Sequence, residues 1–366
     1  MRTPSFMRLT ALALIFSAGL FGRADAFEYR QIDDWAVSCN NGYGCTISFN
    51  PPAGQSGRAD LAAIQWHRTI DSNAPLTLSL PSPPGFAEKG DAKGEFSISV
   101  DGADVFSVRV SQIVSNNASG TLGVSQPGEM IRLFRRMADG KQATVSYSGG
   151  LGEFSASIML TGLLDSARFI DVYQGREGRS DAIVAPGNIT PPEKANVWSI
   201  DLYEELPQSI LRNLSDENSF CYTDEAHLEQ ADAFGFKGKS TTIIVLPCGA
   251  SGAYNQPYQI YVGRDQDFHR SEFPNFGTDG ITVLDTVYNV NFDLKNMKLS
   301  STYLGRGLGD CGLAHYWRID PEASGNPLVL THERAKNACD GNDAGAENWP
   351  LIWQAKDLPV LKTDSQ

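Results

Sequence analysis

Six cysteines fall into three neighbouring pairs along this chain, and this arrangement constrains its fold more than any other feature of the sequence. The pairs are Cys39 with Cys45, Cys221 with Cys248, and Cys311 with Cys339. Other connectivities are open to six cysteines, but proximity favours these three disulfides. The first pair flanks a tight turn, so its Cα atoms can approach without strain. Each of the other pairs closes a loop of nearly thirty residues, which we expect to stabilise the fold by about 3–4 kcal/mol.

The beginning of the chain has the pattern of a cleavable signal peptide. Arg2 and Arg8 give it a positive start, an apolar stretch follows at residues 9–21, and the small residues at 24–26 fit a cleavage site after Ala26. The apolar stretch is shorter than the ~20 residues that span a bilayer, and no later run reaches that length. We therefore predict a periplasmic protein with no membrane span after signal cleavage, in a compartment where disulfides persist.

Charge and size narrow the classes of protein further. Residues 1–26 carry three arginines and one aspartate, so 27 basic residues face 42 acidic residues in the remainder, a net charge of −15. Such a chain is repelled by nucleic acid and by anionic lipid surfaces. The remaining length of about 340 residues favours two domains. With 41% apolar residues the chain can bury real cores, so the disulfides supplement a core.

Alternating apolar and polar residues predict a β-sandwich-like N-terminal domain over residues 27–177. A hairpin is indicated at residues 35–49, where Asn and Gly form the turn between two alternating runs. Further strands are predicted at residues 63–67, 76–80, 96–100, 105–113, 143–147 and 154–160. Helical spacing of apolar residues predicts helices at 127–137 and 163–173. Prolines and glycines at residues 178–196 indicate a linker.

The second half, residues 197–366, is predicted to be an α+β domain of antiparallel strands with a few helices. Helices are expected around residues 206–214 and 223–234. Strands are expected at residues 242–246, 258–262, 281–287, 297–303, 315–319 and 328–331. The predicted fold class of the whole chain is therefore α+β, mainly β, and disulfides cross-link the fold.

Three segments resemble nucleotide- or metal-binding motifs, but the sequence around each one does not fit such a site. Residues 233–240 match a permissive phosphate loop, but a helix precedes them and a strand follows, which reverses the required order. The glycine-rich run 305–312 lies between two predicted strands rather than before a helix. Residues 340–345 resemble the start of a calcium loop, but the acid needed at its twelfth position is Leu351. An EF-hand is excluded and an irregular calcium site stays open.

Catalytic motifs are absent from the sequence, so we predict no catalytic residue, no cofactor and no metal. The five histidines are scattered, and H-E-x-x-H, C-x-x-C and G-x-S-x-G do not occur. Pairs of carboxylates for glycoside hydrolysis cannot be judged, because that test is a spatial separation. His315, between Ala314 and the aromatic pair Tyr316-Trp317, is interpreted as packed structure rather than as a base.

Five segments spread along the chain carry a family resemblance. They are Asp34-Trp35-Ala36-Val37-Ser38-Cys39, the run 167–176 that ends in Tyr173-Gln174-Gly175-Arg176, the run 248–255 that ends in Gly252-Ala253-Tyr254-Asn255, the glycine-rich run 305–312, and Cys339-Asp340-Gly341 followed by Trp349-Pro350. On these segments the chain resembles the bacterial domain-of-unknown-function family numbered 1176, whose members are exported envelope proteins. The resemblance implies a periplasmic location and supplies no reaction. Through its Trp-x-Val-x-Cys opening, the N-terminal half is also distantly similar to the invasion-associated locus B family.

The function predicted from these observations is a non-catalytic binding or interaction protein of the cell envelope, whose partner is an envelope protein or a glycan. Glycine-rich loops on a stapled scaffold suit recognition. The candidate contact residues are Tyr254, Asn255, Arg306, Asp310 and Trp349. Structural interpretations compete with this role: Tyr254 as core, Asp310 as the cap of a turn, Arg306 as the partner of an acid, and Trp349 as a ring buried beside Pro350.

Two alternative functions stay open. The acidic chain could inhibit or sense a basic cell-wall hydrolase through complementary charge. It could also be an envelope enzyme acting on glycans or peptides, with Trp317, Trp349 and Trp353 stacking on sugars.

Overall fold

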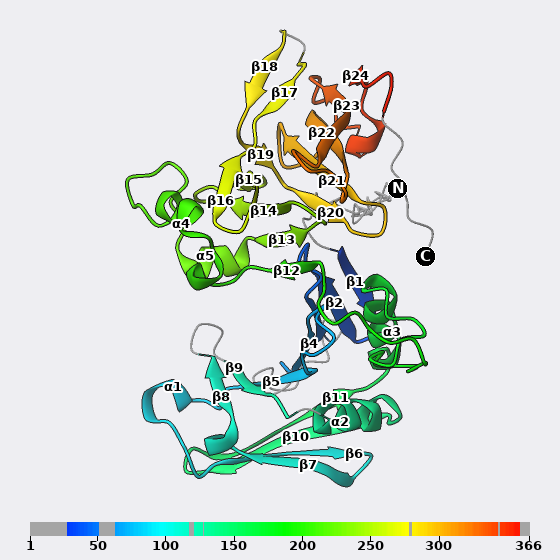
Figure 1. Cartoon of the computed structure of the whole chain (residues 1–366). Coiled ribbons are helices and arrows are strands. Elements are labelled where there is room, and N and C mark those ends of the chain that lie inside the picture. Colours follow the sequence, from blue (N-terminus) through cyan, green and yellow to red (C-terminus); the bar gives the residue numbers. More distant parts are fainter. Residues whose placement is uncertain are drawn as a thin grey trace, which may run out of the picture.

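The computed structural model describes residues 28–50, 63–116, 121–126, 128–277, 280–342 and 345–358. The expected signal peptide and its cleavage site after Ala26 lie outside the described residues. Two groups of sheets follow one another along the chain, the first lower and the second upper in Figure 1. Among the described residues, no helix has the length and apolar character needed to cross a membrane.

The N-terminal half contains a seven-stranded and a four-stranded antiparallel sheet. The first has the order β1-β2-β3-β4-β5-β9-β8, with bounds Glu28–Ile32, Trp35–Cys39, Cys45–Phe49, Gln65–Arg68, Thr77–Pro81, Thr121–Val124 and Val114–Asn116. The second has the order β11-β10-β6-β7, with bounds Gly152–Met159, Gln142–Gly149, Glu95–Val100 and Ala103–Arg109. The helical elements are α1 (Phe86–Lys89), η1 (Val110–Gln112), α2 (Glu129–Ala138) and α3 (Leu163–Tyr173).

One core joins these two sheets and the two longer helices. Strand β6 buries every second residue (Phe96, Ile98 and Val100), as expected for a strand with one covered face. Helix α2 contributes Phe134, whose ring meets the Trp66 ring edge-on at 5.2 Å. Both sheets, α2 and α3 supply residues to the same cluster. The predicted sandwich-like arrangement is therefore confirmed.

The C-terminal half contains a second pair of packed sheets. One has the order β12-β13-β14-β15-β16, with β19 added to β15; the bounds are Val197–Ser199, Phe234–Lys237, Thr242–Pro247, Pro257–Arg264, Asp267–Arg270 and Val287–Tyr288. The other runs β20-β21-β22-β23-β24, with bounds Asn291–Asp293, Lys298–Leu304, Gly312–Ile319, Leu328–Lys336 and Leu351–Gln354. A separate hairpin joins β17 (Phe273–Asn275) to β18 (Thr282–Leu284).

Apolar residues cover both faces of the six-stranded sheet. One face shares a core with the five-stranded sheet, to which Phe234, Ile260 and Trp317 contribute. The other face is covered by η2 (Tyr203–Glu205), α4 (Gln208–Leu214) and α5 (Glu225–Gln230). A further short helix, η3 (Ala346–Asn348), precedes β24. The chain is mostly β with antiparallel sheets, so the predicted fold class is confirmed.

Several predicted elements have different bounds. The strand expected at residues 105–113, for example, ends at Arg109 and is followed by the 3-10 helix η1. Two further differences have a tertiary cause. The helix expected at residues 223–234 ends at Gln230, because Asp232 adopts a left-handed conformation (φ 56°) and Phe234 begins a central strand. The strand expected at residues 281–287 is divided into β18 and β19, which pair with different neighbours. In both places a tertiary partner decides the local structure.

The three disulfides predicted from proximity are confirmed. Cys39 and Cys45 face each other across the β2–β3 pair, with Cα atoms 4.1 Å apart. The Cys221–Cys248 bridge ties the loop before α5 to the end of β14. The third bridge, Cys311–Cys339, joins the start of β22 to the loop that follows β23.

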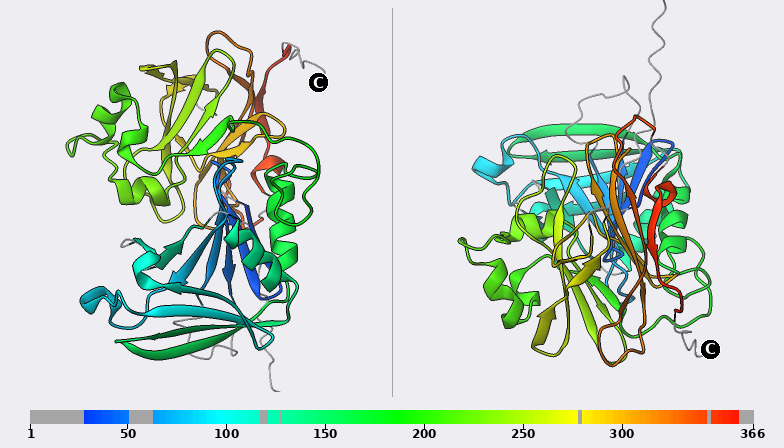
Figure 2. Two further views of the ribbon diagram at one scale, coloured as in Figure 1. Left: turned by 60° about the horizontal axis from the view of Figure 1, so that its bottom comes forward. Right: turned by 90° about the horizontal axis from the view of Figure 1, so that it is seen from above.

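The turn between β2 and β3 joins the two halves by inserting into the C-terminal half, where the blue strands rise towards β12 in Figures 1 and 2. Asn41 Nδ2 donates to Asp232 (2.7 Å) and to the Val290 carbonyl (2.9 Å), and its Oδ1 accepts from the Phe292 amide (2.8 Å). The Tyr43 ring meets the Phe292 ring of the C-terminal half edge-on, with centroids 6.2 Å apart. This buried contact fixes the first half against the second.

Arg176 holds the segment after α3 against the N-terminal half. Its buried guanidinium donates to the Thr69 and Ile70 carbonyls at 2.8 Å and pairs with Asp181. Ile183 is also buried, so this part of the predicted linker is packed against the N-terminal core. The domain boundaries at residues 177 and 197 stay a prediction.

Candidate functional site: the outer face of the C-terminal sheet

Five polar or aromatic residues form a straight row across the five-stranded sheet. Each member lies directly opposite the next on the neighbouring strand, in the order Asn291, Ser300, Tyr316, His332 and Gln354. All five are exposed or half-buried. Because side chains alternate between the faces of a strand, residues directly opposite one another share a face. We call this set the outer row.

The outer row lies on the face that points away from the core. On β21, Lys298, Ser300 and Thr302 face outwards, whereas Leu299 and Ser301 are buried between them. The next row along the outer face joins Asp293, Lys298 and Arg318. A five-stranded sheet with one covered face should alternate in this way, but its exposed face carries an unusual run of neutral polar groups.

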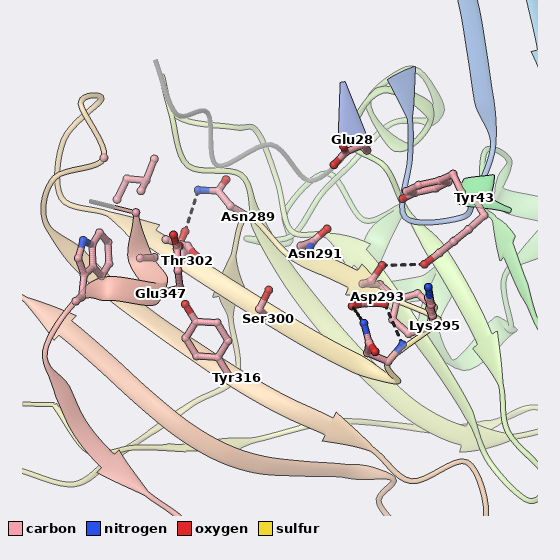
Figure 3. A pocket seen from close by; sticks show the side chains of 18 of the residues that line it. Glu28, Tyr43, Asn289, Asn291, Asp293, Lys295, Ser300, Thr302, Tyr316 and Glu347 are labelled. Atoms are coloured by element: carbon pink, nitrogen blue, oxygen red, sulfur yellow. Dashed lines mark hydrogen bonds between the residues drawn. The ribbon is translucent and has the colours of Figure 1, made fainter. Parts of the chain in front are cut away.

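A cavity of about 770 Å³ lies over one end of the outer row, at the junction of the two halves. Asn291, Ser300 and Tyr316 point into it, and Glu28 and Tyr43 face them from the N-terminal half (Figure 3). A second cavity of about 530 Å³ continues over Tyr316, His332 and Gln354. Both cavities are lined by Asn291, Ser300 and Tyr316, so they adjoin over the outer row; we call the two together the groove.

Hydrogen bonds hold the walls of this groove. Asn289 Nδ2 donates to the Thr302 carbonyl at 2.9 Å, which fixes the segment before β20 against β21. The Leu294 amide donates to the Tyr43 hydroxyl at 2.7 Å and ties the N-terminal turn to the opposite wall. Among the described residues, the side chains of Asn291 and Ser300 have no such partner, and their amide and hydroxyl groups face the cavity.

Two aromatic rings lie at the middle of the outer row. Tyr316 stacks on His332, with ring centroids 4.3 Å apart and nearly parallel planes. Burial raises the pKa of the Tyr316 phenol, so it remains a hydrogen-bond donor. Burial, with the nearby charges of Arg334 and Lys298, lowers the pKa of His332, so its ring is neutral at neutral pH. The centre of the groove therefore offers neutral polar and aromatic groups.

Trp349 is the one residue of the predicted contact set that lines this groove, although it is only 2% exposed. It packs with Leu304 and Ala314 against the outer face of the sheet. Arg334 Nη1 donates to the Trp349 carbonyl at 2.6 Å. The ring therefore forms the end wall of the groove.

Arg306 and Asp310 form a bidentate ion pair in the β21–β22 turn. Arg306 Nε lies 2.7 Å from Asp310 Oδ1, and Arg306 Nη2 lies 2.5 Å from Asp310 Oδ2. Asp310 also accepts from the Gly341 amide at 2.6 Å. The guanidinium of Arg306 holds the pKa of Asp310 well below its usual range. The carboxylate therefore fastens the turn to the loop that carries Cys339.

Asn255 and Tyr254 lie beside the same turn. The Asn255 side chain donates to the Leu304 carbonyl (2.8 Å) and accepts from the Leu304 amide (2.9 Å), as a paired strand would. Tyr254 is 43% exposed and packs over Gly307. The structure thus gathers four of the five predicted contact residues at one end of the sheet, next to the groove. Their role in binding stays a prediction.

The described residues around the Cys311–Cys339 disulfide give little support to a metal site. A carboxylate oxygen of Asp310 lies near the sulfurs of Cys311 and Cys339, but both sulfurs are joined in a disulfide and cannot act as thiolate ligands. The irregular calcium site left open at residues 340–345 includes residues 343–344, which lie outside the described residues.

The sequence analysis did not find the outer row. Its only local signal was the alternation along residues 298–304 and 312–319, which predicts a strand but not its neighbours. The suggested sugar-stacking role of Trp317 is wrong, because this ring is 1% exposed and packs on Phe273 at 5.0 Å. Trp353 stacks on Phe276 at 4.5 Å instead.

Comparison with known proteins agrees with the resemblance drawn from the sequence. A family described as "Protein of unknown function (DUF1176)" matches residues 29–356. The chain belongs to the DUF1176 family. The matched span of this DUF1176 chain includes both halves and all five strands of the sheet that carries the outer row. The similarity to the invasion-associated locus B family stays a prediction.

One relative is the "Uncharacterized protein YpfG" of Escherichia coli (strain K12). It is 25% identical to this DUF1176 chain over 350 residues, which cover 88% of this chain and 92% of the relative. The similarity therefore extends over nearly the whole of both proteins. No solved structure matches the chain.

Proposed function

We propose that this DUF1176 chain is an exported, periplasmic protein that binds an extended glycan of the cell envelope along the outer row. The observation that carries the proposal is the uninterrupted row from Asn291 to Gln354 on an exposed sheet face, continuous with a cavity of about 770 Å³. The proposal concerns binding at this face and includes no reaction there.

The chemistry of the groove suits a carbohydrate. Sugars are neutral, present many hydroxyl groups and have apolar ring faces, so they bind amide and hydroxyl side chains beside aromatic rings. Asn291, Ser300 and Gln354 provide the polar groups, and Tyr316 and His332 provide the rings. Five strands at ~4.8 Å spacing give the row a length of roughly 19 Å, enough for several linked sugar rings.

The charge of the protein supports the same choice of ligand. The chain carries a net charge of −13, which disfavours nucleic acid and anionic lipid. Asp293, Glu347 and Lys295 all line the large cavity, so it holds both signs of charge. Export is supported by the N-terminal signal pattern and by three disulfides, which persist in an oxidising compartment.

The first test is sedimentation of the purified protein with insoluble peptidoglycan sacculi, followed by calorimetry with soluble oligosaccharides of N-acetylglucosamine. We expect the wild-type protein to bind. Tyr316→Ala and Asn291→Ala should each weaken binding by about tenfold, which corresponds to the loss of one aromatic or polar contact of about 1.4 kcal/mol. Tyr222→Ala is the matched control, because Tyr222 is 37% exposed and belongs to a different loop.

Retention of full binding by Tyr316→Ala and Asn291→Ala would remove the outer row as the site. Failure of the wild-type protein to bind either glycan would refute the proposal. That result would favour an envelope protein as the partner, including a cell-wall hydrolase. The double variant Arg306→Ala/Asp310→Ala tests the predicted contact residues at the end of the groove. Unchanged binding by that variant would assign these two residues to structure alone.

A further inference from the structure

The core-facing side of the same five-stranded sheet carries a second row of polar side chains. Ser301 on β21 lies opposite His315 on β22, which lies opposite Glu333 on β23. The three residues are 2%, 4% and 0% exposed. Buried polar groups cost free energy unless they have partners, so three polar side chains in register, two of them ionisable, require a physical reason.

The three side chains are arranged in sequence around the imidazole ring. Ser301 Oγ lies 3.4 Å from His315 Nδ1, and His315 Nε2 lies 3.8 Å from Glu333 Oε1. The other oxygen of Glu333 accepts from the Phe276 amide at 2.8 Å, which orients the carboxylate. With its proton on Nε2, His315 points that proton towards Glu333 and a free lone pair on Nδ1 towards Ser301.

Packing fixes the plane of this imidazole. The His315 ring stacks on Trp317, two residues along the same strand, with centroids 5.5 Å apart and planes 17° from parallel. Burial lowers the pKa of His315 to about 4, so the ring is neutral at neutral pH. A serine hydroxyl beside a neutral, oriented imidazole is the arrangement that activates serine nucleophiles.

Ser301 and His315 are not enclosed in solid packing but line a cavity of about 300 Å³. Asn275 lines it too, and the exposed Tyr303 and half-buried Tyr288 form its outer part. His315 Nε2 and Asn275 Oδ1 are buried without a hydrogen-bond partner in the described part of the chain. Buried polar atoms of this kind beside a cavity indicate space for a polar ligand or water.

We propose that Ser301 is a nucleophile for acyl transfer, with His315 as its general base, Glu333 as the residue that positions His315, and a small carboxylic ester as the substrate. The cavity volume lies at the lower end of the range for small-molecule sites, ~300–1,000 Å³. It therefore fits a short acyl group better than a long chain. This activity goes beyond the proposed glycan binding and uses the opposite face of the sheet.

The reaction balances with water as the second reactant. Ser301 Oγ attacks the ester carbonyl while its proton moves to His315 Nδ1, and a bond forms between Oγ and the carbonyl carbon. The bond from that carbon to the alcohol oxygen then breaks, and the alcohol takes the proton from Nδ1. Water then attacks the acyl carbon while one of its protons moves to His315 Nδ1. The bond from that carbon to Ser301 Oγ breaks, Oγ takes the proton from Nδ1, and the carboxylic acid leaves.

Two neighbouring serines provide a matched control. Ser300 and Ser301 are consecutive on β21 and point to opposite faces, the first into the glycan groove and the second into the small cavity. Ser300→Ala should weaken glycan binding and leave the reactive serine unchanged. Ser301→Ala should have the reverse effect, so the two proposals can fail independently.

The experiment treats the purified, disulfide-bonded protein with a small fluorophosphonate probe and maps the adduct by peptide mass spectrometry, alongside hydrolysis of p-nitrophenyl acetate. We expect one adduct, on Ser301, in native but not in denatured protein. Ser301→Ala should abolish both signals, and His315→Gln should lower the hydrolysis rate by roughly 10²-fold or more. Glu333→Gln should lower kcat about tenfold and shift the pH dependence of kcat, because a neutral amide then replaces the carboxyl group beside His315. A loss of folded protein would lower kcat without moving this pH dependence.

An unlabelled wild-type protein, or an adduct on any residue other than Ser301, would overturn the proposal. Equal ester hydrolysis by wild type and Ser301→Ala would do the same. Mapping of the wild-type adduct needs no variant, so the test holds even if one of the substitutions disturbs folding. Melting temperatures of all variants show which proteins remain folded.

Discussion

Asn41 offers the sharpest test of how the two halves are held together. It is 1% exposed at the tip of the β2–β3 turn, and its side chain makes three hydrogen bonds to the C-terminal half. Asn41→Ala removes all three and leaves the Asp232 carboxylate, the Val290 carbonyl and the Phe292 amide with fewer partners in a buried space. The bond from the Asn41 amide to Asp232 at 2.9 Å is kept.

The expected loss follows from these contacts. Each hydrogen bond contributes about 0.5–1.5 kcal/mol net, and a buried group left without a partner costs about 1–3 kcal/mol. The free energy of unfolding should therefore fall by about 3–5 kcal/mol in Asn41→Ala. Burial also raises the pKa of Asp232 well above its usual value, so this carboxyl depends strongly on its donors.

The measurement is urea unfolding at neutral pH, followed by tryptophan fluorescence. Asn218→Ala is the matched control, because Asn218 is exposed and, in the described part of the chain, bonds only to Asp216 within its own loop. That control should change the free energy of unfolding by less than about 0.5 kcal/mol. If Asn41→Ala loses less than about 1 kcal/mol, the turn does not fasten the two halves as the contacts imply.

Two further predictions concern the C-terminal sheet. Replacing Cys311 and Cys339 by Ser opens a loop of 28 residues and should lower the free energy of unfolding, measured without reductant, by about 3–4 kcal/mol. Opening the six-residue Cys39–Cys45 loop should cost less, because a shorter loop restricts the unfolded chain less. An equal loss for both would contradict this dependence on loop length. Burial lowers the pKa of His315 in the folded state to about 4, so its contribution to stability is present above about pH 6.5 and is lost as the pH falls towards 4. The free energy of unfolding should fall by about 1–3 kcal/mol over this pH range, because burial also raises the pKa of the neighbouring Glu333, whose protonation has the opposite effect on stability. His315→Gln should remove this pH dependence of stability. If the variant keeps the wild-type pH dependence, other groups cause it.

Local patterns in the sequence determined much of the secondary structure. Helix α3 has the predicted bounds, because its apolar residues recur at helical spacing and a glycine lies on each side, at Gly162 and Gly175. Strands such as β6 and β14 followed from alternation or from a continuous apolar run. The three disulfides followed from proximity, since cysteines close in the sequence meet at the smallest entropic cost.

The short edge strands were missed because little in their sequence distinguishes them from loops. Strand β12 has three residues and β20 has three, and each exists because a longer neighbour pairs with it. Their formation depends on a partner far away in the chain rather than on local propensity.

The functional faces were decided by the tertiary structure alone. His315 was interpreted as simple packing, because nothing near it in the sequence shows that Ser301 and Glu333 lie opposite it. The register of β21, β22 and β23 places them there, and a shift of one residue would turn each side chain to the other face. The same register aligns Ser300 with Tyr316 on the outer face.

The sequence by itself determined the class of fold, the disulfide framework and the family of this protein. These depend on composition, periodicity and short-range spacing, which are visible in one dimension. Only the tertiary structure decided which residues share a cavity. Asn41 and Asp232 are 191 positions apart, and the groove takes residues from both halves of the chain. Such contacts arise when strand register and packing bring distant segments together, and no local pattern encodes them.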